Sequence, residues 1–172
     1  MRRLAPFLAA AALTLAISAP AAAARPEHSR TEVAPPVELA AGEACDFAIT
    51  LVNTDVRGKV SIWEYDDGSV RYLERGHAAG YAENASGDRV TQSGGYRIEI
   101  MFHPDGSADV SASGTLFVWY FAGDPIVGLA APGVYGVRGH GTESYAADGS
   151  LAAARFYGGR VVDLCAALTP TG

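Results

Sequence analysis

Apolar and mainly polar residues alternate over residues 96–103, within a stretch, residues 95–121, that carries the most apolar hairpin pattern in the chain. The apolar face of its first strand alternates with a mainly polar face: Tyr96, Ile98, Ile100 and Phe102 against Arg97, Glu99, Met101 and His103. A period of two is typical of a β-strand with one buried face. Pro104-Asp105-Gly106 then supplies a turn, because proline presets the first corner and glycine takes the left-handed position after it. The pattern predicts a long antiparallel hairpin that ends in an aromatic run.

Short alternations of the same kind continue on both sides of this hairpin, and no stretch shows a helical stripe. Strands are predicted over residues 47–52, 59–65, 69–75, 81–84, 89–92, 96–103, 108–121, 134–145, 151–157 and 160–165. Turn residues separate them, including Asn53-Thr54-Asp55, the pair Gly76 and Gly80, and three copies of Asp-Gly-Ser. The residues that flank the three copies do not match, so they indicate one turn used three times rather than a repeat.

These segments amount to an all-β meander of about eight to ten antiparallel strands. A meander of that length must protect its edge strands, and closure into a β-barrel does so; a two-sheet β-sandwich is the alternative. Gly136, Gly139 and Gly141 interrupt one strand, as glycines at bulges and sharp bends do. Residues 122–133 form the one long irregular connection, and its apolar part, residues 127–131, has no clear period and is either a short strand or a loop over one end of the domain.

The amino terminus has the three parts of a secretory signal peptide. A basic start at Met1-Arg2-Arg3 precedes an apolar run over residues 4–19 and small residues over 21–24. The run is short for a membrane anchor, so we expect residues 1–24 to be removed and the chain to be secreted. Residues 25–43 contain three prolines and few large apolar groups, and we expect a disordered leader there. The domain itself is expected over residues 44–168, with a tail over 169–172.

Two cysteines, Cys45 and Cys165, lie at the two ends of the predicted domain. In an exported chain such a pair predicts one disulfide. A redox pair is usually close in sequence, and these cysteines are far apart. The bridge favours the barrel over the sandwich, because the first and last strands are neighbours in an up-and-down barrel.

The charge of the chain bears on its partners. The formal net charge is −6, and loss of residues 1–24 removes Arg2 and Arg3 and no acid, which makes it −8. An acidic domain repels nucleic acid and anionic membrane surfaces. We therefore expect no nucleic-acid partner and no membrane insertion after signal cleavage.

The four histidines, at positions 28, 77, 103 and 140, show no metal-site spacing, and the chain has no nucleophile elbow and no nucleotide-binding glycine loop. No metal and no cofactor are expected.

One candidate ligand site remains: Arg138, His140 and Thr142 share a strand face beside two glycines. If that face points inward, the three side chains are polar anchors in an apolar cavity; if it points outward, they are solvated surface groups, which is the more common case.

Other residue types that carry chemistry are present without a distinctive pattern. Glu83, Glu99 and Asp109 could pair for acid–base work, which needs a defined separation across a cleft. The aromatic residues able to line a sugar or lipid site are as typical of a core or of cross-strand pairs: Trp63, Phe117, Trp119 and Tyr120.

The two ends of the domain carry a resemblance. Cys45-Asp46-Phe47, Gly123-Asp124-Pro125 and the closing residues 159–165, GRVVDLC, resemble a set of small secreted single-disulfide proteins of high-GC Gram-positive bacteria. The resemblance covers residues 44–168 and is specific at the two cysteine motifs. The set has no assigned activity, so it implies an exported all-β domain and no catalytic residues.

Three functions fit this description. The favoured one is non-catalytic binding of a small apolar ligand or of an extracellular surface, since small barrels can hold one ligand. The second is a barrel enzyme of the cyclase or isomerase kind, resembling allene oxide cyclase or the dirigent-like barrels. The third is a structural protein associated with the cell wall. An open interior with an isolated histidine or carboxylate would favour the enzyme.

Overall fold

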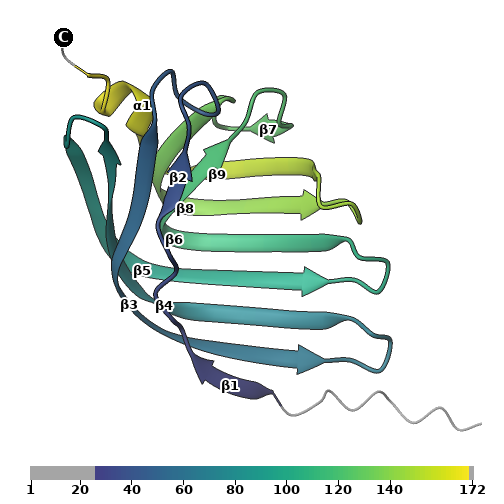
Figure 1. Cartoon of the computed structure of the whole chain (residues 1–172). Helices are drawn as coiled ribbons and strands as arrows, with labels where there is room; N and C mark the ends of the chain where they lie inside the picture. Colours follow the sequence, from purple (N-terminus) through teal and green to yellow (C-terminus); the bar gives the residue numbers. More distant parts are fainter. Residues whose placement is uncertain (1–25, 171–172) are drawn as a thin grey trace, which may run out of the picture.

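A computed structural model describes residues 26–170, and its fold is all-β (Figure 1). The elements in chain order are β1 (Glu27–Arg30), β2 (Val37–Leu39), β3 (Ile49–Glu64), β4 (Val70–Asn84), β5 (Arg89–Phe102), β6 (Ala108–Tyr120), β7 (Ile126–Val127), β8 (Gly133–Tyr145), β9 (Leu151–Asp163) and α1 (Leu164–Ala167). The predicted signal peptide lies outside the described residues. In the part of the chain that the structure describes, no helix has the length and apolarity needed to cross a membrane.

The strands form one nine-stranded sheet in the order β1-β3-β4-β5-β6-β8-β9-β7, and β2 also pairs with β3. Every pairing is antiparallel except that of β7 with β9. The sheet is not closed, because β1 and β7 at its two ends do not pair with each other. The all-β prediction is confirmed, and closure into a barrel stays a prediction.

The main strands are fewer and longer than the sequence pattern predicted. Asn53-Thr54-Asp55 was expected to be a turn, but it is a register shift within the continuous strand β3. Strand β4 runs through Gly76 and Gly80 in the same way, and β9 joins two predicted strands into one. Clusters of glycine and short polar residues mark bends inside these strands, which is why they read as turns.

The hairpin turns, by contrast, follow the prediction. In each Asp-Gly-Ser copy the aspartate carboxylate accepts hydrogen bonds from the backbone N–H and the hydroxyl of the serine two residues later, at 2.9 and 2.6 Å. These bonds, first of all the one from the serine hydroxyl, lower the pKa of Asp67, Asp105 and Asp148. The three turns are therefore the same local structure used at three hairpins.

A row of glycines crosses the sheet in register and bends it. Across β3, β4, β5, β6, β8 and β9 the paired residues are Gly58, Gly76, Tyr96, Gly114, Gly139 and Gly159. At four of these glycines an added Cβ would lie within 3.0 Å of backbone atoms of the neighbouring strand: Gly76, Gly114, Gly139 and Gly159. Only glycine permits so close an approach.

The sharpness of the bend follows from one hydrogen bond. Tyr120 pairs with Gly133 at one end of β8, yet its hydroxyl donates to Glu143 near the other end, at 2.8 Å. Ten residues of straight strand span roughly 33 Å. The β6–β8 pair must therefore fold back on itself between these residues, and the glycine row lies there.

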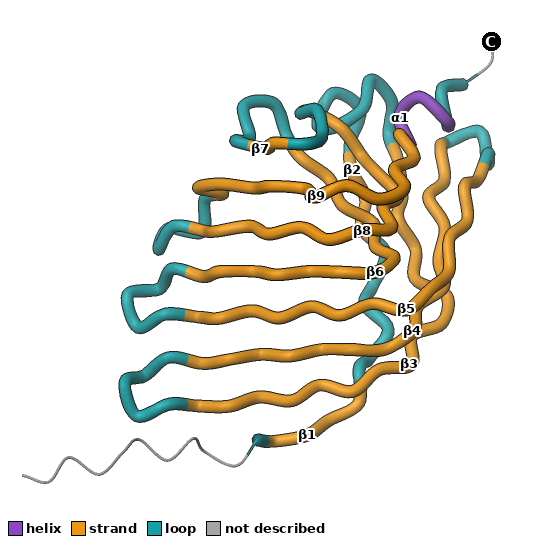
Figure 2. Tube along the Cα trace, turned by 180° about the vertical axis from the view of Figure 1, so that it is seen from behind, coloured by secondary structure: helices purple, strands orange, loops and turns teal. Residues whose placement is uncertain are grey.

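Beyond the glycine row the sheet splits into two arms. Strands β5 and β6 pair only as far as Tyr96 and Gly114, although β5 begins at Arg89 and β6 ends at Tyr120. On one side of the split, β3, β4 and β5 form the first arm; on the other, β6, β8 and β9 form the second (Figures 1 and 2). The opposite ends of the strands stay together as a single layer, which we call the flat end.

The main hydrophobic core lies between the arms. Its buried members come from both arms, β2, α1 and the adjoining segments: Leu39, Ala44, Cys45, Ile49, Leu51, Ala82, Val134, Leu164 and Leu168. The disulfide between Cys45 and Cys165 closes this end, with its Cα atoms 5.4 Å apart, and so the predicted bridge is confirmed. A second cluster, with Tyr120, Tyr135 and Val137, packs under the segment 126–131.

Part of the expected disordered leader, residues 27–39, is attached to the sheet. Residues 27–30 pair with the far end of β3, and residues 37–39 pair with its beginning. Few apolar side chains are needed for this, because backbone N–H and C=O groups form the pairing. Residues 31–36 thus cross from one end of β3 to the other, and we call them the strap.

Candidate functional site

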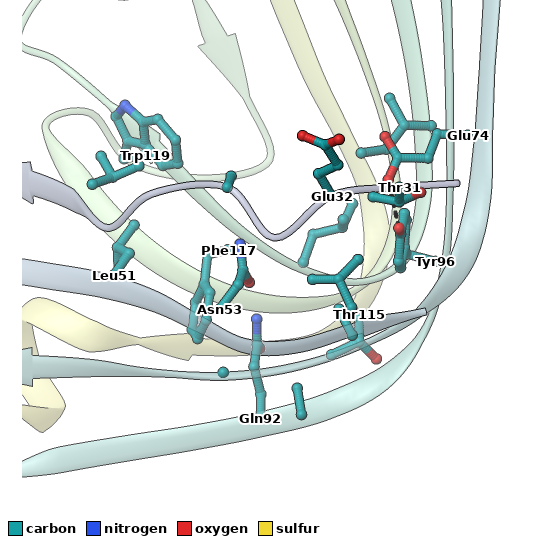
Figure 3. Close-up of a pocket in the computed structure, with 18 residues that line it drawn as sticks. Thr31, Glu32, Leu51, Asn53, Glu74, Gln92, Tyr96, Thr115, Phe117 and Trp119 are labelled. Atoms are coloured by element: carbon teal, nitrogen blue, oxygen red, sulfur yellow. Dashed lines mark hydrogen bonds between the residues drawn. The ribbon is translucent and has the colours of Figure 1, made fainter. Parts of the chain in front are cut away.

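A cavity of about 350 Å³ lies between the two arms beneath the strap (Figure 3). Both arms and the strap contribute to its wall. Most of its lining is apolar, including Val37, Leu51, Val56, Ile98, Phe117 and Trp119. Its volume and composition are typical of a site for a small molecule.

Three polar side chains from different strands also line the cavity. They are Asn53 at the bulge of β3, Gln92 of β5 and Thr115, which directly follows the glycine row in β6. None of the three side chains hydrogen-bonds to another group among the described residues. The amide oxygen of Asn53 lies against Gly80, and that of Gln92 lies against Gly136, where a larger residue would displace them. These amides and this hydroxyl are therefore available to a ligand.

A carboxylate held by two tyrosines lies at one end of the cavity. Tyr96 donates to Oε1 of Glu74 and Tyr72 donates to Oε2, both at 2.5 Å. Burial, followed by the hydrogen bond to Glu74, raises the pKa of Tyr96 to about 12 and raises that of Tyr72 further. The Thr31 hydroxyl on the strap is buried without a well-formed hydrogen bond, although it lies near enough to lower the pKa of Tyr96 slightly. Both phenols thus stay protonated and act as donors.

A second carboxylate is held in the same way on the other half of the sheet. Tyr120 and Tyr145 donate to Oε1 and Oε2 of Glu143, at 2.8 and 2.6 Å. Burial and the neighbouring carboxylate raise the pKa of both phenols. This group ties the second arm to the flat end across the bend, so its role is structural.

The two tyrosine–glutamate groups were not predicted from the sequence. A faint signal exists in the spacing, because Tyr72 and Glu74, like Glu143 and Tyr145, are two residues apart and so share a strand face. The third member of each group, Tyr96 or Tyr120, comes from a strand that only the folded sheet brings near.

The predicted ligand-binding residues lie on the outer side of the sheet. Arg138 and His140 are exposed, and the His140 ring stacks on Tyr157 with ring centroids 5.3 Å apart. The Thr142 hydroxyl lies 3.4 Å from the Tyr157 hydroxyl. The structure thus brings His140 and Thr142 together against one tyrosine, outside the cavity beneath the strap. Both residues also line a smaller, mainly apolar cavity of about 170 Å³, and a binding role for them stays a prediction.

The candidate acid–base residues are engaged in ion pairs. Glu83 pairs with an arginine across the β4–β5 hairpin, Glu99 is shared by two arginines, and Asp109 lies 3.0 Å from His103. Among the aromatic candidates, Phe117 and Trp119 line the cavity, whereas Trp63 lies under the guanidinium of Arg71. Over residues 26–170 no group of three potential ligand residues could hold a metal ion.

Alkaline pH is expected to destabilise the fold through the Tyr96 phenol. Its folded-state pKa of about 12 exceeds the ordinary value of about 10. The resulting stabilisation is complete below pH 10 and is lost as the pH rises toward 12, because the unfolded chain releases this proton more readily. Urea unfolding at pH 8 to 11.5 measures the effect. Tyr96→Phe should make the free energy of unfolding less dependent on pH, while Tyr157→Phe, at an exposed tyrosine, should leave this dependence unchanged. The same pH dependence in both variants would contradict the role assigned to Tyr96.

Comparison with protein-family models, with curated proteins and with solved structures found no match to this chain.

Proposed function

We propose that this chain is an exported, non-catalytic protein that binds one small apolar molecule between the two arms of its sheet. The observation that carries the proposal is the cavity itself: an apolar wall interrupted by the free polar groups of Asn53, Gln92 and Thr115. A few fixed polar groups in an apolar wall orient a ligand and select it. The disulfide is compatible with an extracellular location.

The lining also defines the chemistry of the ligand. It contains two carboxylates, Glu74 and Glu32, and no lysine, arginine or histidine among its residues. Burial of an anion beside them would leave its charge without a partner, which is costly. Amide and hydroxyl groups instead suit a neutral carbonyl or alcohol. The proposed ligand is therefore an uncharged apolar molecule with one such group.

The same lining favours binding over catalysis. Both oxygens of Glu74 already accept tyrosine hydrogen bonds, so it is not the isolated acid or base that a cyclase or isomerase of the barrel type would need. The tyrosines have raised pKa values and are weaker acids for it. Closure of the sheet into a barrel would enclose the ligand further, but the proposal does not require it, because the two arms and the strap already form a wall around the cavity.

The proposal is tested with Trp119 as the reporter. The chain has two tryptophans, and only Trp119 lines the cavity, so Trp63→Phe leaves a single emitter there. Titration with 1-decanol is expected to change its emission with saturation, and decanoate of equal chain length is expected to bind at least about tenfold more weakly, a difference of roughly 1.4 kcal/mol. Equal binding of both would contradict the assigned ligand chemistry.

A substitution that fills the cavity separates specific binding from surface adsorption. Ala78 lines the cavity and its β5 partner is Gly94, so Ala78→Phe places a ring in the empty space. Affinity for 1-decanol should fall at least about tenfold. The matched control, Ala152→Phe, adds the same ring at an exposed position of β9 and should bind as the parent does. Loss of binding in both variants, or in neither, would refute the cavity as the site.

A further inference from the structure

Basic side chains form a single file across the outer side of the sheet. In register across β1, β3, β4, β5, β6 and β8 lie Arg30, Lys59, Arg75, Arg97, Ser113 and His140, which we call the basic row. Four permanent cations thus occupy neighbouring strands. Hydrogen-bonded strands are roughly 4.8 Å apart, so the cations follow one another at about that interval.

The position of the basic row beside the glycine row fixes the side to which it points. A Cβ at Gly58 would meet the Thr31 hydroxyl and the Tyr96 hydroxyl, so the glycine row faces inward toward the strap. The next residue along each strand points the opposite way. Lys59 and Arg75 are accordingly exposed, on the convex side of the bend.

The charges of the basic row are only partly balanced by acids. The row itself contains no aspartate or glutamate. Arg97 shares Glu99 with Arg71, but Arg30, Lys59 and Arg75 form no ion pair among the described residues. Like charges directly opposite on adjacent strands destabilise a sheet. This row therefore carries an electrostatic cost in a chain whose net charge is −6, and an anionic partner would remove it.

We propose that the basic row binds a flexible linear polymer of phosphate groups that runs across the strands. A single file of cations matches a single chain of anions, whereas a convex ridge one cation wide offers little to a rigid duplex. Arginine forks favour phosphate oxygens, to which they donate two parallel hydrogen bonds. The directly paired Arg138 and Arg160 lie beside the His140 end of the row and extend the path. This site is separate from the cavity and does not depend on the proposed ligand.

Long-chain inorganic polyphosphate is the probe, with affinity measured by titration calorimetry at 25 to 200 mM salt. The full chain without its signal peptide should bind, and the affinity should fall as salt rises. The double variant K59Q/R75Q should bind at least tenfold more weakly at low salt, and its slope of log affinity against log salt should be shallower by about 1.4, at roughly 0.7 per lost contact. Absence of binding by the unchanged protein would overturn the proposal.

Two controls separate the basic row from net charge. R89Q/R155Q removes the same charge at positions outside the row and should retain the parent affinity; a loss equal to that of K59Q/R75Q would overturn the site. Poly-glutamate carries the same sign of charge on carboxylates, and binding as tight as that of polyphosphate would overturn the phosphate preference. Ala78→Phe should leave polyphosphate binding intact, which distinguishes this test from that of the cavity.

Discussion

Gly114→Ala is expected to lose about 4 kcal/mol or more of the free energy of unfolding, and so to be largely unfolded or aggregated at 37 °C. The added Cβ would lie within 3.0 Å of the carbonyl of Gly95 on the neighbouring strand, where only backbone could move. The residue also has φ +102°, a conformation that side chains rarely adopt. Clash and strain act together at the position where the sheet bends and splits. Chemical denaturation followed by circular dichroism measures the loss.

Gly123→Ala is the matched control for this effect. Its φ of +91° is similar, but a Cβ there meets nothing within 4 Å. It should cost only the backbone strain, about 1 to 2 kcal/mol. Gly159→Ala, at the end of the same row with φ +117° and a carbonyl at the Cβ position, should behave like Gly114→Ala. Equal losses at Gly114 and Gly123 would show that the close approach of the strands does not matter and that the bend has another cause.

Local features of this fold could be predicted from the sequence because their causes are local. The alternation of apolar and polar residues predicted where strands lie. The Asp-Gly-Ser tripeptide predicted three hairpin turns, because its hydrogen bonds join residues only two positions apart. The disulfide followed from two cysteines in a chain that was expected to be exported. Each of these inferences needed only neighbouring residues or the residue count.

The features that depend on register could not be predicted in this way. Each member of the glycine row looks like a turn residue in its own segment, and the row exists only once five pairings are aligned. The strand predicted over residues 96–103 was expected to bury the face that carries Phe102, yet Phe102 is 44% exposed at the flat end. The core lies instead at the split end, where α1 and the strap can reach it.

The cavity escaped prediction for the same reason. Asn53 was assigned to a turn and Gln92 to a short hairpin, and neither has a chemical signature by itself. They become a pair of free amides only because the two arms face each other across a shared space. Arg138, His140 and Thr142 attracted attention because they share a strand face beside two glycines, but the face of a strand that points inward is set by the bend.

The second large effect is expected when the disulfide is removed. Cys45→Ala/Cys165→Ala opens a bridge with a sequence separation of 120. The chain-entropy model assigns about 5 kcal/mol to a loop of this length, and native disulfides in small exported domains typically contribute 2 to 5 kcal/mol. We expect a loss within that range, read as a lower urea midpoint. The bridge ties α1, which follows the second arm, to the segment that enters the first arm, so the arms should also separate more easily and 1-decanol should bind more weakly.

Reduction of the unchanged protein provides the control, because it opens the same bond without altering the core. Its urea midpoint should match that of the double variant to within the cost of the two altered side chains. Contacts that do not involve sulfur also join the arms at this end, including the Asn84 amide bound to the Leu168 carbonyl at 2.8 Å. Asn84→Ala in the reduced protein should therefore weaken the remaining attachment further. Its effect should be larger there than with the bridge intact, since the contact and the bridge both hold the carboxy-terminal segment to the first arm. If bridge removal left the midpoint unchanged, the core and these contacts alone would hold the arms together.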